Sequence, residues 1–132
     1  MLAEEAIFAN DAYYLAFQHK NLSAMESLWA QAAAVTCIHP GWPPLTQRDD
    51  IIESWRQIFS NEKQPGIVAK GAKAFLNGNT ALVVCYETVD GGALVATNGF
   101  IKQADDVYIF HHQASHCAIP LEMGAEAKGA VN

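Results

Sequence analysis

Positive charge is scarce in this chain. Only 8 of its 132 residues are lysine or arginine, against 14 aspartate and glutamate residues, which gives a formal net charge of -6. A surface that neutralises nucleic-acid phosphates or anionic lipid headgroups needs clustered basic residues, and the sequence has no basic run. We therefore expect no nucleic acid and no membrane among its partners.

Long apolar runs and export signals are also missing. No apolar stretch approaches the roughly 20 residues of a membrane-spanning helix, and Glu4 and Glu5 stand where a secretory signal needs positive charge. The cysteines Cys37, Cys85 and Cys117 are odd in number and far apart, without a CxxC pair. These absences predict a cytoplasmic protein with reduced thiols.

Several motifs that mark large enzyme classes do not occur. The sequence has no GxxxxGK[ST] phosphate loop, no GxGxxG after a strand, no GxSxG elbow and no HExxH helix. Nucleotide hydrolysis, dinucleotide redox chemistry and metalloprotease activity are therefore not expected, and we predict no cofactor.

The residues that are present suit a single small domain. With 51% hydrophobic and 17% charged residues, the chain can bury a core, yet it is too short for two ordinary domains. We place one domain over residues 1–119. Residues 120–132 are rich in Gly, Ala and Lys and have little to bury, so they are expected to form a flexible tail.

Apolar periodicity predicts three helices in the first half of the chain. The first runs from Ala3 to Lys20, with Asn10 among the residues of its polar side. Asn21 and Ser23 can cap a short second helix that ends near Gln31.

The third helix has the clearest pattern. Its apolar residues fall on one helical stripe: Ile51, Ile52, Trp55, Ile58 and Phe59. Thr46, followed three residues later by Asp49, resembles a capping box at its start.

Extended segments follow a different period. Val35 to His39 is rich in β-branched and apolar residues and predicts a short strand that ends at Pro40. Beyond Pro65, turn residues separate four longer predicted strands, which span Ile67–Leu76, Thr80–Val89, Ala93–Gln103 and Val107–Ser115. Strands adjacent in sequence pair as antiparallel hairpins. The predicted fold class is therefore α+β.

Two motifs complete a pattern that is known from a protein family. One is His39-Pro40-Gly41-Trp42-Pro43-Pro44 before the third helix, and the other is Phe110-His111-His112-Gln113-Ala114-Ser115 on the last strand. With the order of elements, they resemble the SnoaL-like branch of the nuclear transport factor 2-like superfamily. They are also similar to the association domain of calcium/calmodulin-dependent protein kinase type II. The resemblance implies a cone-shaped, curved antiparallel sheet whose concave face is covered by the three N-terminal helices.

The resemblance also limits the expected functions. The superfamily includes isomerases, epoxide hydrolases, polyketide cyclases and dehydratases, together with members that only bind or assemble, so the fold does not define a reaction. We expect a protein that binds a small apolar organic ligand in the hollow and acts as an acid–base isomerase, hydratase or cyclase. The alternative is a non-catalytic dimerisation or accessory domain.

Strand alternation and the resemblance assign side chains to the two faces of the sheet. Phe110 and His112 are expected in the hollow and His111 on the outer face, although a bulge would exchange the two histidines. On the neighbouring strands, the residues expected inside are Val83, Cys85, Glu87, Leu94, Ala96, Asn98 and Phe100.

Glu87 and His112 are the candidate catalytic pair. A carboxyl group that faces an apolar hollow loses hydration, which raises its pKa and suits it to general acid–base catalysis, and His112 could share protons with it. The alternative is that Glu87 lies near the strand end and reaches water or a surface lysine.

The candidate ligand-binding residues surround this pair, and they are Tyr14, Trp29, His39, Trp42, Trp55, Cys85, Asn98 and Phe110. Trp42 lies on a proline-rich loop and is the better candidate for ligand contact, whereas the helical stripe favours a core position for Trp55. Cys37, His39 and His112 could together form a soft metal site, but further ligands at the usual spacing are missing, so no metal is expected.

Apolar residues occupy both faces of the predicted hairpins. Cys85 and its inward neighbours alternate with Leu82, Val84 and Tyr86 on the opposite face. A sheet covered by helices on one side only would leave a large exposed apolar patch. We therefore expect a homodimer formed through the outer sheet face.

Overall fold

The computed structural model describes residues 1–89 and 92–118; the expected tail and residues 90–91 of an expected turn lie outside these ranges. The elements appear in the predicted order, which confirms the α+β fold class. They are α1 (Ala3–Gln18), α2 (Leu22–Leu28), β1 (Thr36–Ile38), α3 (Arg48–Ser60), β2 (Val68–Asn77), β3 (Thr80–Val89), β4 (Gly92–Gln103) and β5 (Asp106–His116).

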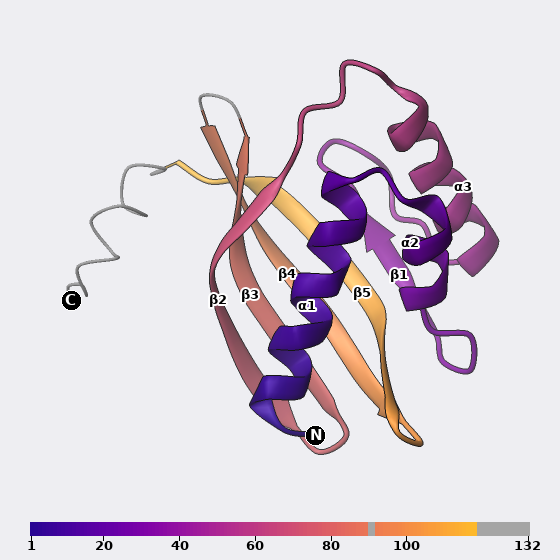
Figure 1. The fold of residues 1–132 in the computed structure, drawn as a ribbon, viewed down its shortest axis with the longest axis vertical. Coiled ribbons are helices and arrows are strands. Elements are labelled where there is room, and N and C mark those ends of the chain that lie inside the picture. Colours follow the sequence, from indigo (N-terminus) through magenta and orange to yellow (C-terminus); the bar gives the residue numbers. More distant parts are fainter. Residues whose placement is uncertain (90–91, 119–132) are drawn as a thin grey trace.

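The strands form one curved sheet in the order β1-β5-β4-β3-β2. Strands β2 to β5 pair antiparallel, as predicted. The short first strand, for which no partner was predicted, pairs parallel to β5 at one edge of the sheet, with Thr36 opposite His111 and Ile38 opposite Gln113. Strand β1 reaches this edge from the helical layer and not through a hairpin, so nothing forces the antiparallel direction. Figure 1 shows α1 across the sheet and α2 and α3 beside β1.

The first two helices end earlier than their apolar pattern predicts. Helix α1 stops at Gln18, and Lys20 adopts a positive φ of 53°. Helix α2 has the predicted cap, since the Asn21 side chain accepts a hydrogen bond from the Ala24 N–H at 3.0 Å. It ends at Leu28 and not near Gln31, because the next residues are extended and the Ala30 N–H donates to the Ile109 carbonyl at 2.9 Å.

The start of α3 corrects the expected capping box of Thr46 and Asp49. The helix begins at Arg48, so its N-cap is Gln47, which makes no side-chain capping bond. The Arg48 guanidinium instead donates to the carbonyls of Glu26 at 2.6 Å and Trp29 at 3.4 Å. This contact ties the start of α3 to the end of α2.

The core lies between the helices and the inner face of the sheet, which we define as the face that α1 covers (Figure 1). Its largest fully buried apolar side chains are Trp29, Trp55, Tyr13, Phe100, Met25, Ile51 and Ile109. Burial of side chains of this size provides most of the favourable free energy of folding in a small domain.

A bulge in β5 changes the face on which one predicted site residue lies. His112 pairs with Asn98 and His111 pairs with Gly99, but Ile109 pairs with Phe100, so Phe110 is an extra residue. Because the bulge precedes both histidines, His112 remains buried on the inner face and His111 lies on the other, as predicted.

The glycine opposite the bulge shows where Phe110 lies. Gly99 stands between the inward residues Asn98 and Phe100, so a Cβ at Gly99 would point to the outer face, where it would meet Cζ of Phe110 at 2.8 Å. The Phe110 ring therefore covers Gly99 on the outer face. The prediction that Phe110 faces the hollow is wrong.

Candidate functional site

A cavity of about 230 Å³ opens between the inner face of the sheet, the helices and the loop after β1. It is lined by Phe17, His39, Pro40, Trp42, Ile58, Gln64, Ile67, Glu87, Leu94 and His112. The walls are mostly apolar, and these lining residues include no lysine or arginine. The volume lies below the roughly 300–1,000 Å³ of pockets for drug-sized ligands, so the cavity suits a smaller molecule.

Glu87 projects from β3 into this cavity and is only 2% exposed. The Tyr14 hydroxyl donates to its Oε2 at 2.6 Å. Burial raises the pKa of Glu87 to about 7, although the Tyr14 hydrogen bond acts in the opposite direction. The carboxyl group therefore changes its protonation state near neutral pH, and it is not the water-exposed strand-end residue of the alternative reading.

His112 projects from β5 beside Glu87, with its Nε2 3.9 Å from Glu87 Oε2. Its ring is 1% exposed and packs against Tyr13, at a centroid distance of 5.3 Å. Burial lowers the pKa of His112 well below its usual range, and the nearby His39 and His111 add to this effect. The imidazole is consequently neutral at physiological pH.

A buried hydrogen-bond network lies behind the pair. His112 Nδ1 is 2.6 Å from Asn98 Oδ1, and Asn98 Nδ2 donates to Asn10 Oδ1 at 2.8 Å and to the Tyr14 oxygen at 3.0 Å. The Cys85 thiol donates to the same Tyr14 oxygen at 3.5 Å. Tyr14, Cys85 and Asn98 thus support the cavity from behind, and none of them lines it.

Asn10 is a site residue that the sequence reading missed. The sequence pattern predicts it on the polar side of the first helix, but it is fully buried on α1. The spacing could have revealed this, because Asn10 precedes the buried Tyr13, Tyr14 and Phe17 by three, four and seven residues.

His39 directly follows β1, the neighbour of β5 in the sheet, and its ring centroid is 6.1 Å from that of His112. Its Nε2 is 2.9 Å from the Ser54 hydroxyl, and Ser54 in turn donates to the Ile51 carbonyl at 2.6 Å. Burial lowers the pKa of His39 to about 4. Ser54 is a second polar contact that the sequence reading did not include among the site residues.

The tryptophans occupy different positions around the cavity. Trp42 packs edge-on against His39 at 4.9 Å and is 37% exposed, which places it at the mouth. Trp55 is fully buried beneath His39, at 4.8 Å, as its helical stripe predicted. Trp29 is a core residue that pairs with Ile109 and does not line this cavity. Of the candidate ligand-binding residues, His39 and Trp42 thus reach the cavity directly.

No metal or membrane feature accompanies this site. Within residues 1–89 and 92–118, no group of three or more His, Cys, Asp or Glu side chains is arranged to hold a metal ion. Over the same ranges, no helix combines the length and apolarity needed to cross a membrane.

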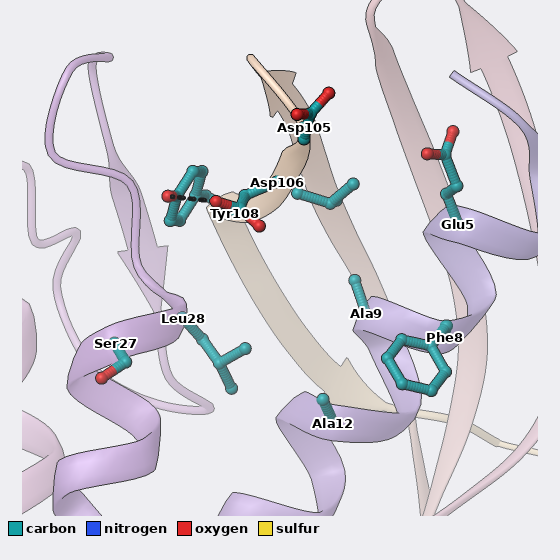
Figure 2. Close-up of a pocket in the computed structure, with 10 residues that line it drawn as sticks. Glu5, Phe8, Ala9, Ala12, Ser27, Leu28, Asp105, Asp106 and Tyr108 are labelled. Carbon is teal, nitrogen blue, oxygen red and sulfur yellow. Dashed lines mark hydrogen bonds between the residues drawn. The ribbon is translucent and has the colours of Figure 1, made fainter.

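A larger groove of about 510 Å³ lies elsewhere, between α1, the end of α2 and the β4–β5 turn. Figure 2 shows Phe8, Ala9 and Ala12 on its α1 side and Leu28 on its α2 side, with Asp105 on the turn and Asp106 at the start of β5. None of its carboxylates is buried, and Glu5 is paired with Lys102 at 2.7 Å. The smaller cavity is lined by three buried titratable side chains, His39, Glu87 and His112, so we take it as the candidate site.

Comparison with solved structures gives two informative relatives. One is a protein of the nuclear transport factor 2-like family from Streptomyces avermitilis, provisionally named a dehydratase, which is 30% identical with a TM-score of 0.79 and covers 87% of this chain and 95% of its own. The other, from Thiobacillus denitrificans, is provisionally named a calcium/calmodulin-dependent protein kinase type II association domain. It is 28% identical with a TM-score of 0.75 and covers 83% of this chain and 92% of its own.

A curated relative is F-box protein SKIP8 from Arabidopsis thaliana, 26% identical over 111 residues. The match covers 83% of this chain and 48% of the relative, so the chain spans about half the length of the curated protein that it resembles. The family model of the SnoaL-like domain matches residues 8–120, which is most of the chain. The protein therefore belongs to the SnoaL-like family, within the nuclear transport factor 2-like superfamily.

Proposed function

We propose that the protein binds a small, uncharged, mostly apolar organic molecule in the cavity and catalyses acid–base chemistry on it with Glu87 and His112. The observation that carries this proposal is a carboxyl group and an imidazole 3.9 Å apart, each at most 2% exposed, in the same apolar cavity. Buried groups with displaced pKa values in a cleft are suited to proton transfer.

The charge of the lining favours an uncharged substrate. The lining residues include no cation that could pair with an anionic ligand, and the Glu87 carboxylate would repel one. With Glu87 protonated and both histidines neutral, the lining has no formal charge. A small carbonyl or hydroxy-carbonyl compound fits these conditions.

The pair can perform an isomerisation with balanced proton transfers. His112 takes a proton from the carbon next to a substrate carbonyl, while Glu87 gives its proton to the carbonyl oxygen, which forms an enol. The imidazolium then returns its proton to a different carbon, and Glu87 takes back the enol proton. General acid–base catalysis of this kind contributes roughly 10² to 10⁴-fold to the rate.

The same groups can carry out a dehydration. His112 takes the proton on carbon, and Glu87 protonates a hydroxyl on the adjacent carbon, which leaves as water while a C=C bond forms. The proton on His112 then passes to Glu87 and restores both groups. The provisional name of the Streptomyces avermitilis relative, a dehydratase, supports this class of reaction.

The test is turnover of uncharged β-hydroxy and β,γ-unsaturated carbonyl compounds, followed by the absorbance of the conjugated product. For any compound that is turned over, Glu87→Gln should lower kcat by about 10² to 10⁴-fold, because the acid is lost. Glu53→Gln changes an exposed carboxyl on α3 and is the matched control. Full activity in Glu87→Gln would refute the acid role.

A second candidate function is association through the outer sheet face, without catalysis. Phe75 and Leu82 are paired neighbours on this face and are 56% and 44% exposed. Exposed apolar neighbours on a sheet favour burial against a second copy. The provisional name of the Thiobacillus denitrificans relative also supports it. Leu82→Glu should abolish self-association, whereas Glu87→Gln, inside the cavity, should leave it unchanged.

A further inference from the structure

A continuous chain of buried hydrogen bonds connects the two members of the pair behind the cavity. It runs from Glu87 through Tyr14 and Asn98 to His112, with heavy-atom distances of 2.6, 3.0 and 2.6 Å. Asn98 is fully buried, and the fully buried Asn10 holds it from the α1 side. Such a chain fixes which atoms donate and which accept.

The single hydroxyl proton of Tyr14 determines the orientation of the Asn98 amide. Tyr14 donates this proton to Glu87, so the Asn98 atom 3.0 Å from the same oxygen must be a donor, which is Nδ2. The other end of the amide, Oδ1, can only accept. His112 Nδ1, at 2.6 Å from it, therefore carries the ring proton.

A neutral imidazole has one N–H group, so the Nε2 of His112 is unprotonated. This nitrogen is the one that lies 3.9 Å from Glu87 Oε2. An unprotonated Nε2 can accept a proton from a substrate but cannot give one. Of the two groups, only Glu87 can then act as the acid at the start of the reaction.

His39 has the opposite arrangement. The Ser54 hydroxyl uses its proton to bond the Ile51 carbonyl, so its oxygen accepts from His39 and the ring proton lies on Nε2. Two buried, neutral histidines of one cavity are thus held in different tautomers by different hydrogen-bond partners.

We infer that Asn98, held by Asn10, is a positioning residue that fixes His112 in the Nδ1–H tautomer and thereby makes it the base and Glu87 the acid. The division of roles rests on the proposed function, whereas the tautomer itself does not. Asn98 acts through His112 and does not line the cavity, so it is not a catalytic residue.

The test is nitrogen NMR of the full chain with ¹⁵N-labelled histidine at pH 8, without any ligand. At this pH the Glu87 carboxylate accepts the Tyr14 proton. His112 should show a protonated Nδ1 and an unprotonated Nε2, and His39 should show the reverse. Asn98→Leu removes the acceptor with little change in size, so His112 should lose the protonated Nδ1 signal. The tautomer of His39 should stay unchanged and report that the fold is intact.

A second variant separates hydrogen bonding from packing. Asn98→Asp keeps an acceptor beside His112 Nδ1, so the Nδ1–H tautomer should be retained, even if Asn98→Leu does not fold. Asn79→Leu, in the exposed β2–β3 turn, is the control and should leave both histidines unchanged. An Nε2–H tautomer of His112 in the wild-type protein would overturn the inference, as would an unchanged tautomer in Asn98→Leu.

The outcome of the NMR test does not depend on the proposed function. If no compound is turned over but the tautomers are as expected, the catalytic proposal fails and the positioning role of Asn98 stands. If Glu87→Gln abolishes turnover but His112 carries its proton on Nε2, the proposed function stands and the positioning role fails.

Discussion

Glu87 and the two cavity histidines have opposite pKa shifts with a common cause. Loss of hydration disfavours the charged form of each group, so burial raises the pKa of the carboxyl and lowers the pKa values of the imidazoles. The same residues that could transfer protons therefore also make the stability of the fold depend on pH.

The sign of this dependence for Glu87 follows from proton binding. Its pKa is about 7 in the folded protein and 4.5 at its ordinary value, so between these pH values the folded state keeps a proton that the unfolded chain has lost. Stability therefore falls as the pH rises through this window. The difference of about 2.5 pKa units corresponds to roughly 3 kcal/mol.

We expect Glu87→Gln to remove the loss of stability that the Glu87 carboxyl causes as the pH rises. Urea unfolding at pH 4.5, 6 and 8 should show the free energy of unfolding of the variant rising relative to wild type by roughly 3 kcal/mol across the series. For the exposed-site variant Glu53→Gln, the free energy of unfolding should change with pH as it does in wild type. A constant difference between Glu87→Gln and wild type would mean that the pKa of Glu87 is ordinary.

At the scale of single residues, strand alternation together with the family resemblance predicted the inward positions of Glu87, Asn98 and His112, which are all buried. Each lies on a long strand whose inner face is otherwise apolar. A polar residue at one of these inward positions is therefore easy to recognise from the sequence. Asn10 and Ser54 lie on helices, where strand alternation does not apply, although the spacing of Asn10 to the buried Tyr13, Tyr14 and Phe17 is a signal of its burial. A polar residue on a helix is ordinarily read as solvent-exposed, and their burial depends on partners that are distant in sequence.

At the scale of the elements, alternation fails where a strand contains an extra residue. The bulge at Phe110 reverses the face of that side chain, while the positions after it remain as predicted. Gly99 is the one local signal, since a glycine inside a strand often marks a bulge or a close approach. The parallel pairing of β1 could not be predicted, because three residues carry too little pattern to define a partner.

The β2–β3 turn offers a controlled test of backbone conformation. A Cβ added at Gly78 or at Gly66 would meet no atom within 4 Å, but Gly78 has a φ of +64° and Gly66 has no positive φ. Gly78→Ala should therefore lower the free energy of unfolding by about 1 kcal/mol, since a left-handed backbone disfavours a Cβ. Gly66→Ala should be neutral or stabilise by up to about 1 kcal/mol.

Urea unfolding of the two variants measures the contrast directly. Because the added methyl group is unhindered at both positions, packing cannot explain a difference between them. Equal effects of the two substitutions would contradict the conformational explanation.

At the scale of the whole molecule, the apolar outer sheet face predicts that stability depends on protein concentration. If two copies associate through this face, the thermal midpoint should rise with concentration, because association stabilises the folded state by mass action. Leu82→Glu should remove this dependence, since it places a charge among exposed apolar neighbours. Phe8→Glu, at a 76% exposed position on α1, should retain it.

Differential scanning calorimetry over a hundredfold range of concentration, with light scattering for the mass, is the measurement. A midpoint of wild type that does not change with concentration, together with a monomeric mass, would refute association through the sheet.

The parallel pairing of β1 with β5 has a consequence for how the protein folds. Thr36 and His111, which hydrogen-bond at 2.7 Å across these strands, are 75 residues apart in the chain. Bringing such distant segments together requires the closure of a long loop, and contacts of high sequence separation slow folding. His39 and His112 come together only after this closure. We therefore expect the hairpins to form first on local contacts, and the cavity to form later, in the slower step that pairs β1 with β5.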